Sequence, residues 1–186
     1  MFEANVYINR RRVLLEQMAS RTAEGNRGIA IFLGNVDAPT NYRGNDYKFR
    51  QDSSFIYYWG IDEPWFAAVL DLDSGDECLY GNDVDIDDII WMGPQPSVAS
   101  KGEAIGCAKT QPLAEFDKAV AAAVAAGRPV HFLPPARYYN QMKLAELTGL
   151  SNASVRKVGP VSAGGASEEL VKAVVALRLI KEQCDI

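Results

Sequence analysis

Residues 65–80 of the chain read WFAAVLDLDSGDECLY and decide the class of fold. The apolar run Trp65–Leu72 predicts a strand, and Asp73–Asp76 has the Gly and Asp residues typical of a tight turn. Glu77–Tyr80 then predicts a second strand that returns beside the first. Two strands joined by so short a turn form an antiparallel hairpin, so we expect antiparallel pairs in the sheet of this protein.

Further short strands are predicted on both sides of this hairpin in the sequence. Ile29–Leu33 is a continuous apolar run that ends at Gly34, and Pro129–Leu133 is a similar run that stops at Pro134–Pro135. Short continuous apolar runs are typical of strands that are buried on both faces of a sheet. Val155–Val158 is a candidate for the last strand.

Four segments are predicted to be helices, because their apolar residues recur at helical spacing or because a glycine closes them. They are Asn5–Ser20, Phe116–Ala126 before Gly127, Tyr138–Leu147 before Gly149, and Glu168–Ile186. Phe55–Trp59 is rich in aromatic residues and fits either a strand or a buried turn of helix. Helices that alternate with short strands predict an α/β fold, here a mixed β-sheet flanked by helices.

The last predicted helix has a start signal but no end signal. Its apolar residues recur at spacings of four and three: Leu170, Val174 and Leu177. Ser167 offers a hydroxyl cap at its start, whereas no Gly, Asn or Pro closes the pattern. We therefore expect a leading domain over residues 1–166 and a connector helix over residues 167–186, which leads into a further domain outside this chain.

Composition and charge narrow the range of partners. The chain has 186 residues and a net charge of −5 at pH 7, and proteins that bind nucleic acid usually carry a basic face instead. The only dense basic run, Arg10–Arg12, is expected to be the solvated face of a helix. No apolar run approaches the roughly 20 residues of a membrane-spanning helix, and the N-terminal residues lack the charge order of a signal peptide. We expect a cytoplasmic protein that binds neither nucleic acid nor membrane.

The cysteine and histidine residues give little support for catalysis. The three cysteines, Cys78, Cys107 and Cys184, are widely spaced, which argues against both a disulfide framework and a zinc site. His131 is the only histidine and lies inside a predicted buried strand, so we interpret it as a hydrogen-bonded structural residue. A nucleophilic pair of His131 with Cys107 or Cys78 requires a proximity that the sequence does not show.

An acidic cluster at residues 83–88 begins like a calcium-binding loop. Its carboxylates are Asp83, Asp85, Asp87 and Asp88. The sixth position of the loop is Asp88 where glycine is required, and the twelfth is Pro94 where glutamate is required. A solvated loop or helix start is the better interpretation. The sequence also lacks phosphate-binding glycine motifs, although a carboxylate-only Mg²⁺ or Mn²⁺ site remains an open alternative.

Residues 47–60 place the polar run Arg50-Gln51-Asp52-Ser53 between aromatic residues. Polar groups among buried aromatic side chains must hydrogen-bond to one another or to the backbone. We expect Arg50 and Asp52 to pair, and Gln51 and Ser53 to cap neighbouring backbone groups. This network either pins a connection against the core or forms a recognition surface.

Residues 89–94, IIWMGP, place Trp91 just before a Gly-Pro turn. One interpretation is that Trp91 packs in the core. The other is that it is an exposed aromatic anchor, because tryptophan offers a large contact area at a low cost in conformational entropy. The residues alone favour neither interpretation.

Residues 47–72, YKFRQDSSFIYYWGIDEPWFAAVLDL, resemble the signature of the N-terminal domain of Xaa-Pro aminopeptidases (aminopeptidase P), in the creatinase/prolidase family. That signature reads Y-x-[FY]-R-Q-[DN]-S-x-F-x-Y-x-x-G-[FI]-x-E-P. Four more segments are similar to the family: RRRVLLEQM (10–18), IIWMGPQPS (89–97), PVHFLPP (129–135) and ALRLIKEQCDI (176–186). In the last of these, Gln183 and Cys184 replace commoner polar residues, and Asp185 stands where the family has glutamate.

This resemblance implies a creatinase N-terminal-like fold that precedes a pita-bread catalytic domain with two divalent metals, usually manganese. The family removes an N-terminal residue that precedes proline, so its substrates are peptides with proline in the second position. All five metal ligands would lie after Ile186, so the chain alone is expected to hold no catalytic residue and no metal. The domain would shape the active-site entrance and the subunit contacts of a homo-oligomer, with Trp91 binding substrate and Arg50–Ser53 acting architecturally.

Other functions remain open at this stage. A prolidase, which cleaves Xaa-Pro dipeptides, has a similar leading domain, although the RQDS run favours the aminopeptidase. A stand-alone binding or assembly module is a second alternative, which the open-ended last helix argues against. A small α/β hydrolase that uses Cys107 with His131 is the third.

Overall fold

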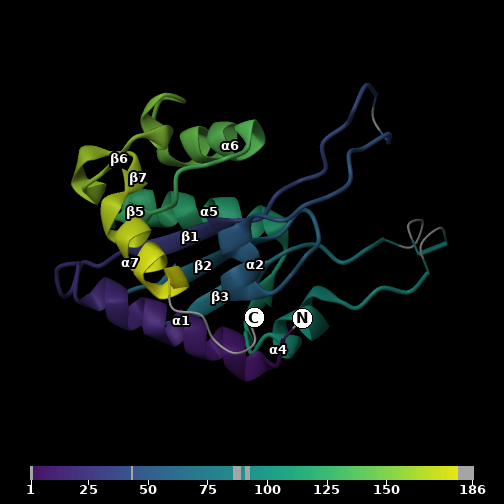
Figure 1. Cartoon of the computed structure of the whole chain (residues 1–186), viewed down its shortest axis with the longest axis horizontal. Coiled ribbons are helices and arrows are strands. Elements are labelled where there is room, and N and C mark those ends of the chain that lie inside the picture. Colours follow the sequence, from purple (N-terminus) through teal and green to yellow (C-terminus); the bar gives the residue numbers. More distant parts are fainter. Residues whose placement is uncertain (1, 43, 86–88, 91–92, 180–186) are drawn as a thin grey trace.

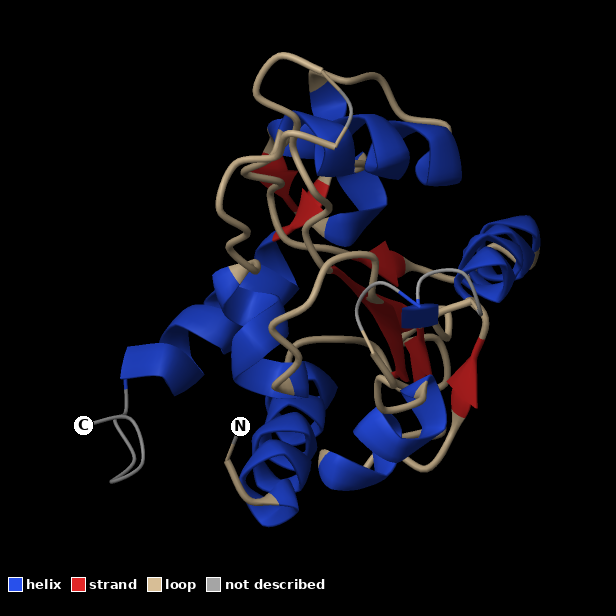
Figure 2. Ribbon diagram, turned by 90° about the vertical axis from the view of Figure 1, so that its right-hand side faces the viewer, coloured by secondary structure: helices blue, strands red, loops and turns tan. Residues whose placement is uncertain are grey.

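The computed structural model describes residues 2–42, 44–85, 89–90 and 93–179, and it has a mixed five-stranded sheet with helices on both faces (Figures 1 and 2). The strands are β1 (Ile29–Leu33), β2 (Ala67–Asp71), β3 (Glu77–Tyr80), β4 (Thr110–Gln111) and β5 (Val130–His131). They lie in the order β4-β3-β2-β1-β5. The inner pairs are antiparallel, whereas the outer strands β4 and β5 run parallel to their neighbours. The prediction of a mixed sheet flanked by helices is confirmed.

The predicted hairpin is the centre of this sheet. In β2 and β3, Ala67 lies opposite Tyr80 and Leu70 opposite Glu77, and the turn between the strands contains Gly75 with a φ of 81°. A positive φ suits glycine, which has no Cβ to clash with the backbone. On its other side, β2 pairs with β1 over the whole length of both strands.

Six helices with bounds in the described ranges cover the sheet, and alternation along the strands decides which side each one meets. The helices are α1 (Ala4–Ala19), α2 (Ser53–Trp59), α4 (Val98–Ala104), α5 (Leu113–Ala125), α6 (Tyr138–Thr148) and α7 (Glu168–Leu179). Successive side chains of a strand point to opposite faces, so Ala30 and Phe32 of β1 contact α1, α2 and α7, whereas Ile29 and Ile31 contact α5 and α6. The fold is a three-layer α/β/α arrangement.

Large side chains fill the first of these faces, which we call the filled face. Phe55, Tyr58 and Trp59 of α2 are fully buried. The ring of Phe32 lies 5.4 Å from the ring of Tyr58 and 6.2 Å from that of Trp59, measured between centroids. Tilted aromatic pairs at such distances are favourable, so α2 is held against the sheet by its own rings.

The prediction that Arg10–Arg12 form a solvated face is wrong for two of the three residues. Arg11 is 1% exposed, and its guanidinium binds both carboxylate oxygens of Glu77, at 2.5 and 2.9 Å. It also donates to the carbonyl oxygens of Tyr58 and Ile105. Arg10 is buried as well, and only Arg12 is exposed.

Helical geometry explains this error. Consecutive residues of a helix point about 100° apart, so three adjacent arginines cannot all face the solvent on a helix that packs on a sheet. A buried guanidinium is tolerated when a carboxylate and carbonyl groups satisfy it, and Glu77 of β3 provides that carboxylate. The partner is far away in sequence and is therefore invisible in a local pattern.

The opposite face, which we call the hollow face, is covered by α5 and α6. Phe116, Val120 and Ala123 of α5 and Leu144 of α6 are buried against β1, β2 and β3. The rest of α5 is rich in alanine, whose side chain is too short to fill the space between a helix and a sheet. A cavity therefore remains under α5. A second cavity on this side of the sheet opens between α5 and α6.

The C-terminal part differs from its prediction in one place. Val155–Val158 is not a strand, because a 3₁₀ turn covers Ser154–Arg156, and the short β6 (Val158–Gly159) pairs with β7 (Ala166–Ser167). A second 3₁₀ turn covers Val161–Ala163.

The predicted start of the last helix is confirmed, because the Ser167 hydroxyl accepts a hydrogen bond from the backbone N–H of Leu170. The helix α7 is described as far as Leu179, and residues 180–186 lie outside the described residues. The boundary between residues 1–166 and 167–186 stays a prediction. In the described ranges, none of the helices combines the length and the apolar character that crossing a bilayer requires.

Candidate functional site

Two long loops leave the same end of the sheet (Figure 1). The first loop comprises residues 36–42 and 44–50 and exposes Tyr42 and Tyr47, and a bridge between Pro39 and Asp46 closes its outer half. The second comprises residues 82–85 and 93–97, and Ile90, described between these two parts of the sequence, is 75% accessible. Exposed large apolar groups on projecting loops are typical of contact surfaces.

Several residues that the sequence singled out lie outside the described ranges, and others are described. Trp91, the predicted substrate-binding residue, lies outside the described residues, as do Asp87, Asp88 and Cys184. Of the acidic cluster, Asp83 and Asp85 are described, and both are exposed. The Asp83 carboxylate accepts a hydrogen bond from the backbone N–H of Val98, the first residue of α4. Asp83 therefore acts locally on the backbone.

The polar run at residues 50–53 forms a network that fixes the base of the first loop. Gln51 is 4% exposed, and its Oε1 accepts hydrogen bonds from the backbone N–H groups of Asn35 and Asp52. Its Nε2 donates to the carbonyl oxygens of Ile61 and Glu63. One amide side chain thus ties three chain segments together, and the predicted backbone capping by Gln51 is confirmed.

The expected ion pair of Arg50 with Asp52 is absent from the described contacts. The Asp52 carboxylate instead accepts from the backbone N–H groups of Ser54 and Phe55 and so caps α2. Uncapped N–H groups at a helix start are strong donors, and an aspartate at this position satisfies them without a cation. Arg50 is exposed, and its carbonyl oxygen accepts from Asn35 Nδ2. Ser53 is exposed as the first residue of α2, with no capping bond among the described contacts.

His131 is a structural residue, as predicted. It is fully buried, with Nδ1 2.7 Å from the Ser167 hydroxyl and Nε2 2.9 Å from the carbonyl oxygen of Arg27. The Ser167 hydroxyl also lies 2.8 Å from Oε2 of Glu169. Burial lowers the pKa of His131, although the bond to Arg27 and the charge of Glu169 oppose this shift.

The proposed pairing of His131 with a cysteine is not found. Both ring nitrogens of His131 are occupied, and the Cys107 thiol contacts the carbonyl oxygen of Lys109 instead. Burial raises the pKa of Cys107 to about 11, so the thiol stays protonated near neutral pH. Cys78 is buried too, and burial raises its pKa as well.

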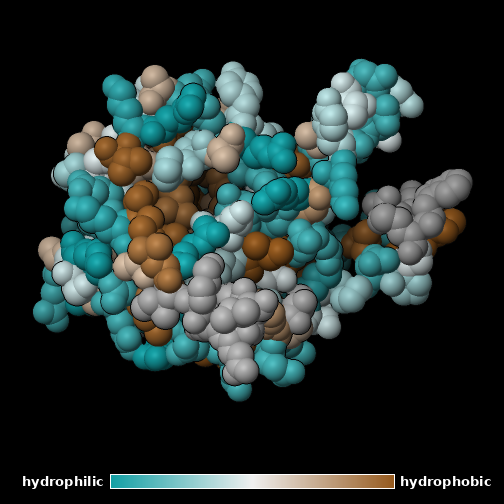
Figure 3. Space-filling model, viewed as in Figure 1, coloured by the Kyte–Doolittle hydropathy of each residue, from teal (hydrophilic) through white to brown (hydrophobic). Residues whose placement is uncertain are grey.

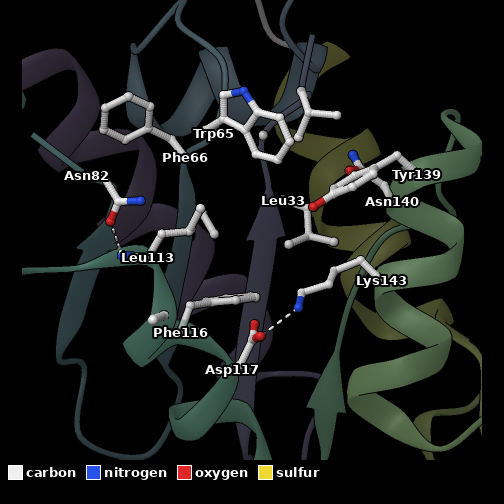
Figure 4. A pocket seen from close by; sticks show the side chains of 14 residues that line it. Leu33, Trp65, Phe66, Asn82, Leu113, Phe116, Asp117, Tyr139, Asn140 and Lys143 are labelled. Atoms are coloured by element: carbon white, nitrogen blue, oxygen red, sulfur yellow. Dashed lines mark hydrogen bonds and ion pairs between the residues drawn. The ribbon is translucent and has the colours of Figure 1, made fainter. Parts of the chain in front are cut away.

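A bowl-shaped cavity of about 240 Å³ opens at the end of the sheet, between α5 and α6 (Figure 4). Its lining is formed by Leu33, Gly34, Val36, Trp65, Phe66, Ala67, Asn82, Leu113, Ala114, Phe116, Asp117, Tyr139, Asn140 and Lys143. We call this cavity the bowl. Concave apolar sites with a few convergent polar groups are the usual form of a ligand pocket.

Trp65 forms one wall of the bowl in a strained conformation. Its φ of 65° is the only positive value at a non-glycine residue in the described ranges. Two contacts hold it there: its backbone N–H donates to the carbonyl oxygen of Asn35, and its indole Nε1 donates to Asp37 Oδ2 at 3.0 Å. The indole meets the Tyr139 ring edge-on, with centroids 5.7 Å apart. Backbone strain of this kind is concentrated at functional sites.

The lower edge of the bowl carries an ion pair. Lys143 Nζ lies 2.6 Å from Asp117 Oδ2 and 3.8 Å from Glu146 Oε2. Although burial alone would lower the pKa of Lys143, its hydrogen bond and charge contact with Asp117 raise it, so the ammonium stays charged. The bowl thus has an apolar floor and one charged group of each sign at its edge.

Sequence reasoning missed the bowl. Trp65 was interpreted as the start of a strand, whereas it precedes β2 and turns outward. The sequence signals that mark it are Pro64 before the tryptophan and the exposed pair Tyr138–Tyr139 at a helix start, but nothing local brings these segments together. In the part of the chain that the structure describes, no three His, Cys, Asp or Glu residues group in a way that suits a metal ion.

The family of the chain follows from comparison with known proteins. Residues 7–131 match the family model of the aminopeptidase P N-terminal domain. The chain therefore belongs to this family. The resemblance inferred from residues 47–72 is confirmed.

Curated relatives carry peptidase names and are much longer. Xaa-Pro aminopeptidase 3 of Rattus norvegicus is 27% identical in a match that covers 95% of this chain and 35% of that protein. Xaa-Pro aminopeptidase 3 of Mus musculus is 30% identical in a match that covers 57% of this chain and 22% of that protein. Intermediate cleaving peptidase 55, mitochondrial, of Arabidopsis thaliana is 24% identical over 97% of this chain and 34% of its own length. Where the match covers nearly the whole chain, the chain thus spans about a third of the relative's length.

Solved structures show the same fold. Aminopeptidase P from E. coli, in its low-pH form, superposes with a TM-score of 0.63 at 20% identity, over 90% of this chain and 36% of that one. Proline aminopeptidase P II from Yersinia pestis gives a TM-score of 0.63 at 19% identity, with the same coverage.

Proposed function

We propose that this chain is the non-catalytic leading domain of a metal-dependent Xaa-Pro aminopeptidase, a hydrolase that removes an N-terminal residue preceding proline. In this role it shapes the entrance to the active site and provides subunit contacts in a homo-oligomer. The substrates of the whole protein are peptides with proline in the second position. The catalytic centre belongs to polypeptide beyond this chain.

The single observation that carries this proposal is the comparison with the rat relative. That protein is named an Xaa-Pro aminopeptidase, and 95% of this chain matches only 35% of it. The family match to the aminopeptidase P N-terminal domain over residues 7–131 supports a position in the leading part of such a protein. The remainder of the relative's length is enough for a separate catalytic domain.

The outer side of α7 supports the proposal of a following domain. Val175 and Leu179 of this helix are 53% and 76% exposed, and apolar side chains gather over this region in Figure 3. Exposed apolar residues at helical spacing suit contact with another domain. In the proposed parent protein, the catalytic domain packs along this side of α7.

The two metals of the proposed enzyme are assigned to the catalytic domain. In the described residues of this chain, no three His, Cys, Asp or Glu side chains group in a way that would hold them. When bound, such metals supply a nucleophilic hydroxide and polarise the substrate carbonyl. This chain contributes the first loop, whose base Gln51 anchors, and Trp91 is the residue that we propose contacts the substrate.

Peptide cleavage tests whether the catalytic centre lies outside this chain. The purified 186-residue chain and the product of the complete reading frame are each incubated with Mn²⁺ and a tripeptide whose second residue is proline. We expect cleavage by the longer protein alone, and no cleavage when alanine replaces the proline. Cleavage by the 186-residue chain would overturn the proposal. An Xaa-Pro dipeptide separates the alternatives, since preferential cleavage of the dipeptide would identify a prolidase.

Trp91 is tested in the longer protein. We expect Trp91→Ala to lower kcat/KM on Xaa-Pro tripeptides by about tenfold, which corresponds to one lost aromatic contact. The matched control is Ile90→Ala, which removes an exposed apolar residue next to it. Equal activity of the two variants would remove Trp91 from the substrate-binding role.

Assembly and localisation follow from the same proposal. Light scattering of the longer protein is expected to give a multiple of the monomer mass, and a monomer would contradict the proposed subunit contacts. We propose a cytoplasmic location. Cell fractionation tests it, with the protein detected in each fraction by an antibody against residues 1–166. Recovery with membranes or in an organelle would contradict this location.

A further inference from the structure

The bowl has an apolar interior that is open to solvent on one side (Figure 4). Leu33 lies at its centre, Trp65 and Tyr139 stand on two sides, and Phe116 closes the lower left in this view. Trp65 and Tyr139 are both more than 40% exposed, although each has a large apolar ring. Burying these rings against an apolar ligand is favourable, since the apolar surface leaves water.

Polar groups around this interior retain hydrogen-bonding capacity. Asn82 Oδ1 accepts from the backbone N–H of Leu113, but among the described contacts its Nδ2 has no acceptor. The Tyr139 hydroxyl likewise has no partner in the described ranges, and Figure 4 shows it directed over Leu33. An amide and a hydroxyl can each bond the carboxylate or ammonium group of a small polar ligand.

The charged edge of the bowl has a definite pattern. Lys143 and Asp117 lie 2.6 Å apart, with side chains 21% and 45% exposed, so both remain accessible. A ligand that carries a positive and a negative charge on adjacent atoms can pair its negative charge with Lys143 and its positive charge with Asp117. The ligand and the two side chains then have no net charge together. A polyanion such as a phosphate ester that binds Lys143 would also lie close to the carboxylates of Asp117 and Glu146, which contact the same ammonium group. Like charges so close together repel each other.

We propose that the bowl binds a free α-amino acid with an uncharged aliphatic or aromatic side chain. The ligand carboxylate contacts the Lys143 ammonium, and the ligand ammonium contacts the Asp117 carboxylate. The ligand side chain lies on Leu33 between the rings of Trp65 and Tyr139. An α-amino acid carries its two charges on adjacent positions, as the Lys143–Asp117 pair requires.

The size of the bowl agrees with this class of ligand. Pockets for drug-sized molecules have volumes of roughly 300–1,000 Å³, and a cavity of about 240 Å³ is suited to something smaller. The strained backbone of Trp65 is held by contacts outside the bowl, to Asn35 and Asp37. The aromatic wall is therefore in place before the ligand arrives, which favours binding. Amino acids are also products of the proposed parent reaction, but binding in the bowl requires no catalytic domain.

Binding is measured on the 186-residue chain by ¹H–¹⁵N NMR, with the Trp65 indole signal as the probe. Trp65→Phe identifies this signal by its disappearance. We expect L-leucine and L-phenylalanine to shift it saturably, with a dissociation constant of about 1 mM. N-acetyl-leucine and leucine amide each lack one of the two charges and are expected to bind at least tenfold more weakly. Equal shifts from the blocked compounds, or no shift from either free amino acid, would overturn the proposal.

Substitutions at the charged edge provide the second test. Lys143→Gln and Asp117→Asn are each expected to weaken leucine binding at least fivefold. The matched control is Lys118→Gln, which removes a lysine from the exposed Lys118–Glu115 pair on the same helix as Asp117 and is expected to leave binding unchanged. Loss of binding in the control, or full binding in both edge variants, would contradict the assignment.

A blocking substitution separates binding from folding. Ala114 lies on the exposed lining of the bowl, so Ala114→Leu narrows the cavity without changing its charge. We expect this variant to unfold at an unchanged urea concentration and to lose the leucine-induced shift. A retained shift would show that the amino acid binds elsewhere.

Discussion

The two faces of the sheet are packed in different ways, although the same strands form both. On the filled face, the large side chains of Tyr58 and Trp59 are completely buried. On the hollow face, a cavity of about 350 Å³ lies beneath Ala119, Ala122 and Ala123 of α5, and the bowl of about 240 Å³ opens between α5 and α6. Protein interiors are close-packed as a rule, so a helix of small residues leaves space that a ligand or partner can use. The filled face accordingly provides stability, and the hollow face provides the candidate site.

The largest expected effect compares one phenylalanine from each face. Phe55→Ala on the filled face is expected to lower the free energy of unfolding by about 4 kcal/mol, because its neighbours are too tightly packed to close the new cavity. Phe116→Ala on the hollow face is expected to cost about 3 kcal/mol, because it borders the bowl and its neighbours can relax into that space. Urea unfolding of both variants measures the difference, and an equal or greater loss for Phe116→Ala would contradict the contrast.

The second prediction concerns the buried charge of the filled face. Glu77→Ala leaves Arg11 buried without its carboxylate, which is expected to cost about 3 kcal/mol of unfolding free energy. The control is Arg12→Ala, which removes the exposed ion pair with Glu16 on the same helix and is expected to cost no more than about 0.5 kcal/mol. If Glu77→Ala were as stable as Arg12→Ala, the Arg11 contacts would have no structural importance.

The third prediction is a pH dependence that originates at His131. The pKa of His131 in the folded state lies below its ordinary value of about 6.5. Between the folded pKa and about pH 6.5, the unfolded chain therefore binds more protons than the folded protein does. The stability contribution of neutral His131 is therefore present above about pH 6.5 and is lost as the pH falls toward the folded pKa. The slope cannot exceed about 1.4 kcal/mol per pH unit for one proton.

Unfolding midpoints measured between pH 5 and pH 8 test this dependence in the original chain and in His131→Gln. The variant keeps an amide able to hydrogen-bond but has no titrating group, so its curve is expected to be flatter over this range. The carboxylate of Glu169 titrates at lower pH, since its pKa is lowered, and does not interfere. Identical slopes would exclude His131 as the cause.

The smallest expected effect comes from filling the hollow face. Ala122 is an exposed residue that lines the cavity of about 350 Å³ under α5, and Ala122→Leu places a larger apolar group there. Partial burial of that side chain is expected to stabilise the fold by about 0.5 kcal/mol. The adjacent Ala121→Leu lines no cavity among those described and is expected to change stability by close to zero. The thermal unfolding midpoints of the Ala122→Leu and Ala121→Leu variants are compared. Equal midpoints would show that the cavity does not accept the leucine side chain.

Local sequence patterns predicted much of the architecture. The hairpin, the buried β1 strand and the four long helices were found because their periodicity or turn residues are local properties. The helix α4 and the strand β4 were missed. Residues 98–111 contain two glycines and several charges, and β4 consists of two residues that are defined by pairing with β3.

The candidate site depends on contacts that no local pattern contains. Trp65 and Tyr139 meet across the bowl from distant parts of the chain, and Arg11 meets Glu77 in the same way. The predicted network at residues 50–53 was correct in kind but wrong in its pairing, because the N–H groups of α2 offer Asp52 better partners than Arg50 does. Burial and long-range pairing decide these details.

The margins of the sheet have a practical consequence for handling the protein at high concentration. Each outer strand, β4 and β5, is only two residues long, and Pro112 and Pro129 stand next to them. Proline has no N–H to donate, so neither margin offers a neighbouring molecule a continuous ladder of backbone groups. Concentrated solutions are thereby protected against fibre-like growth through strands added to this sheet.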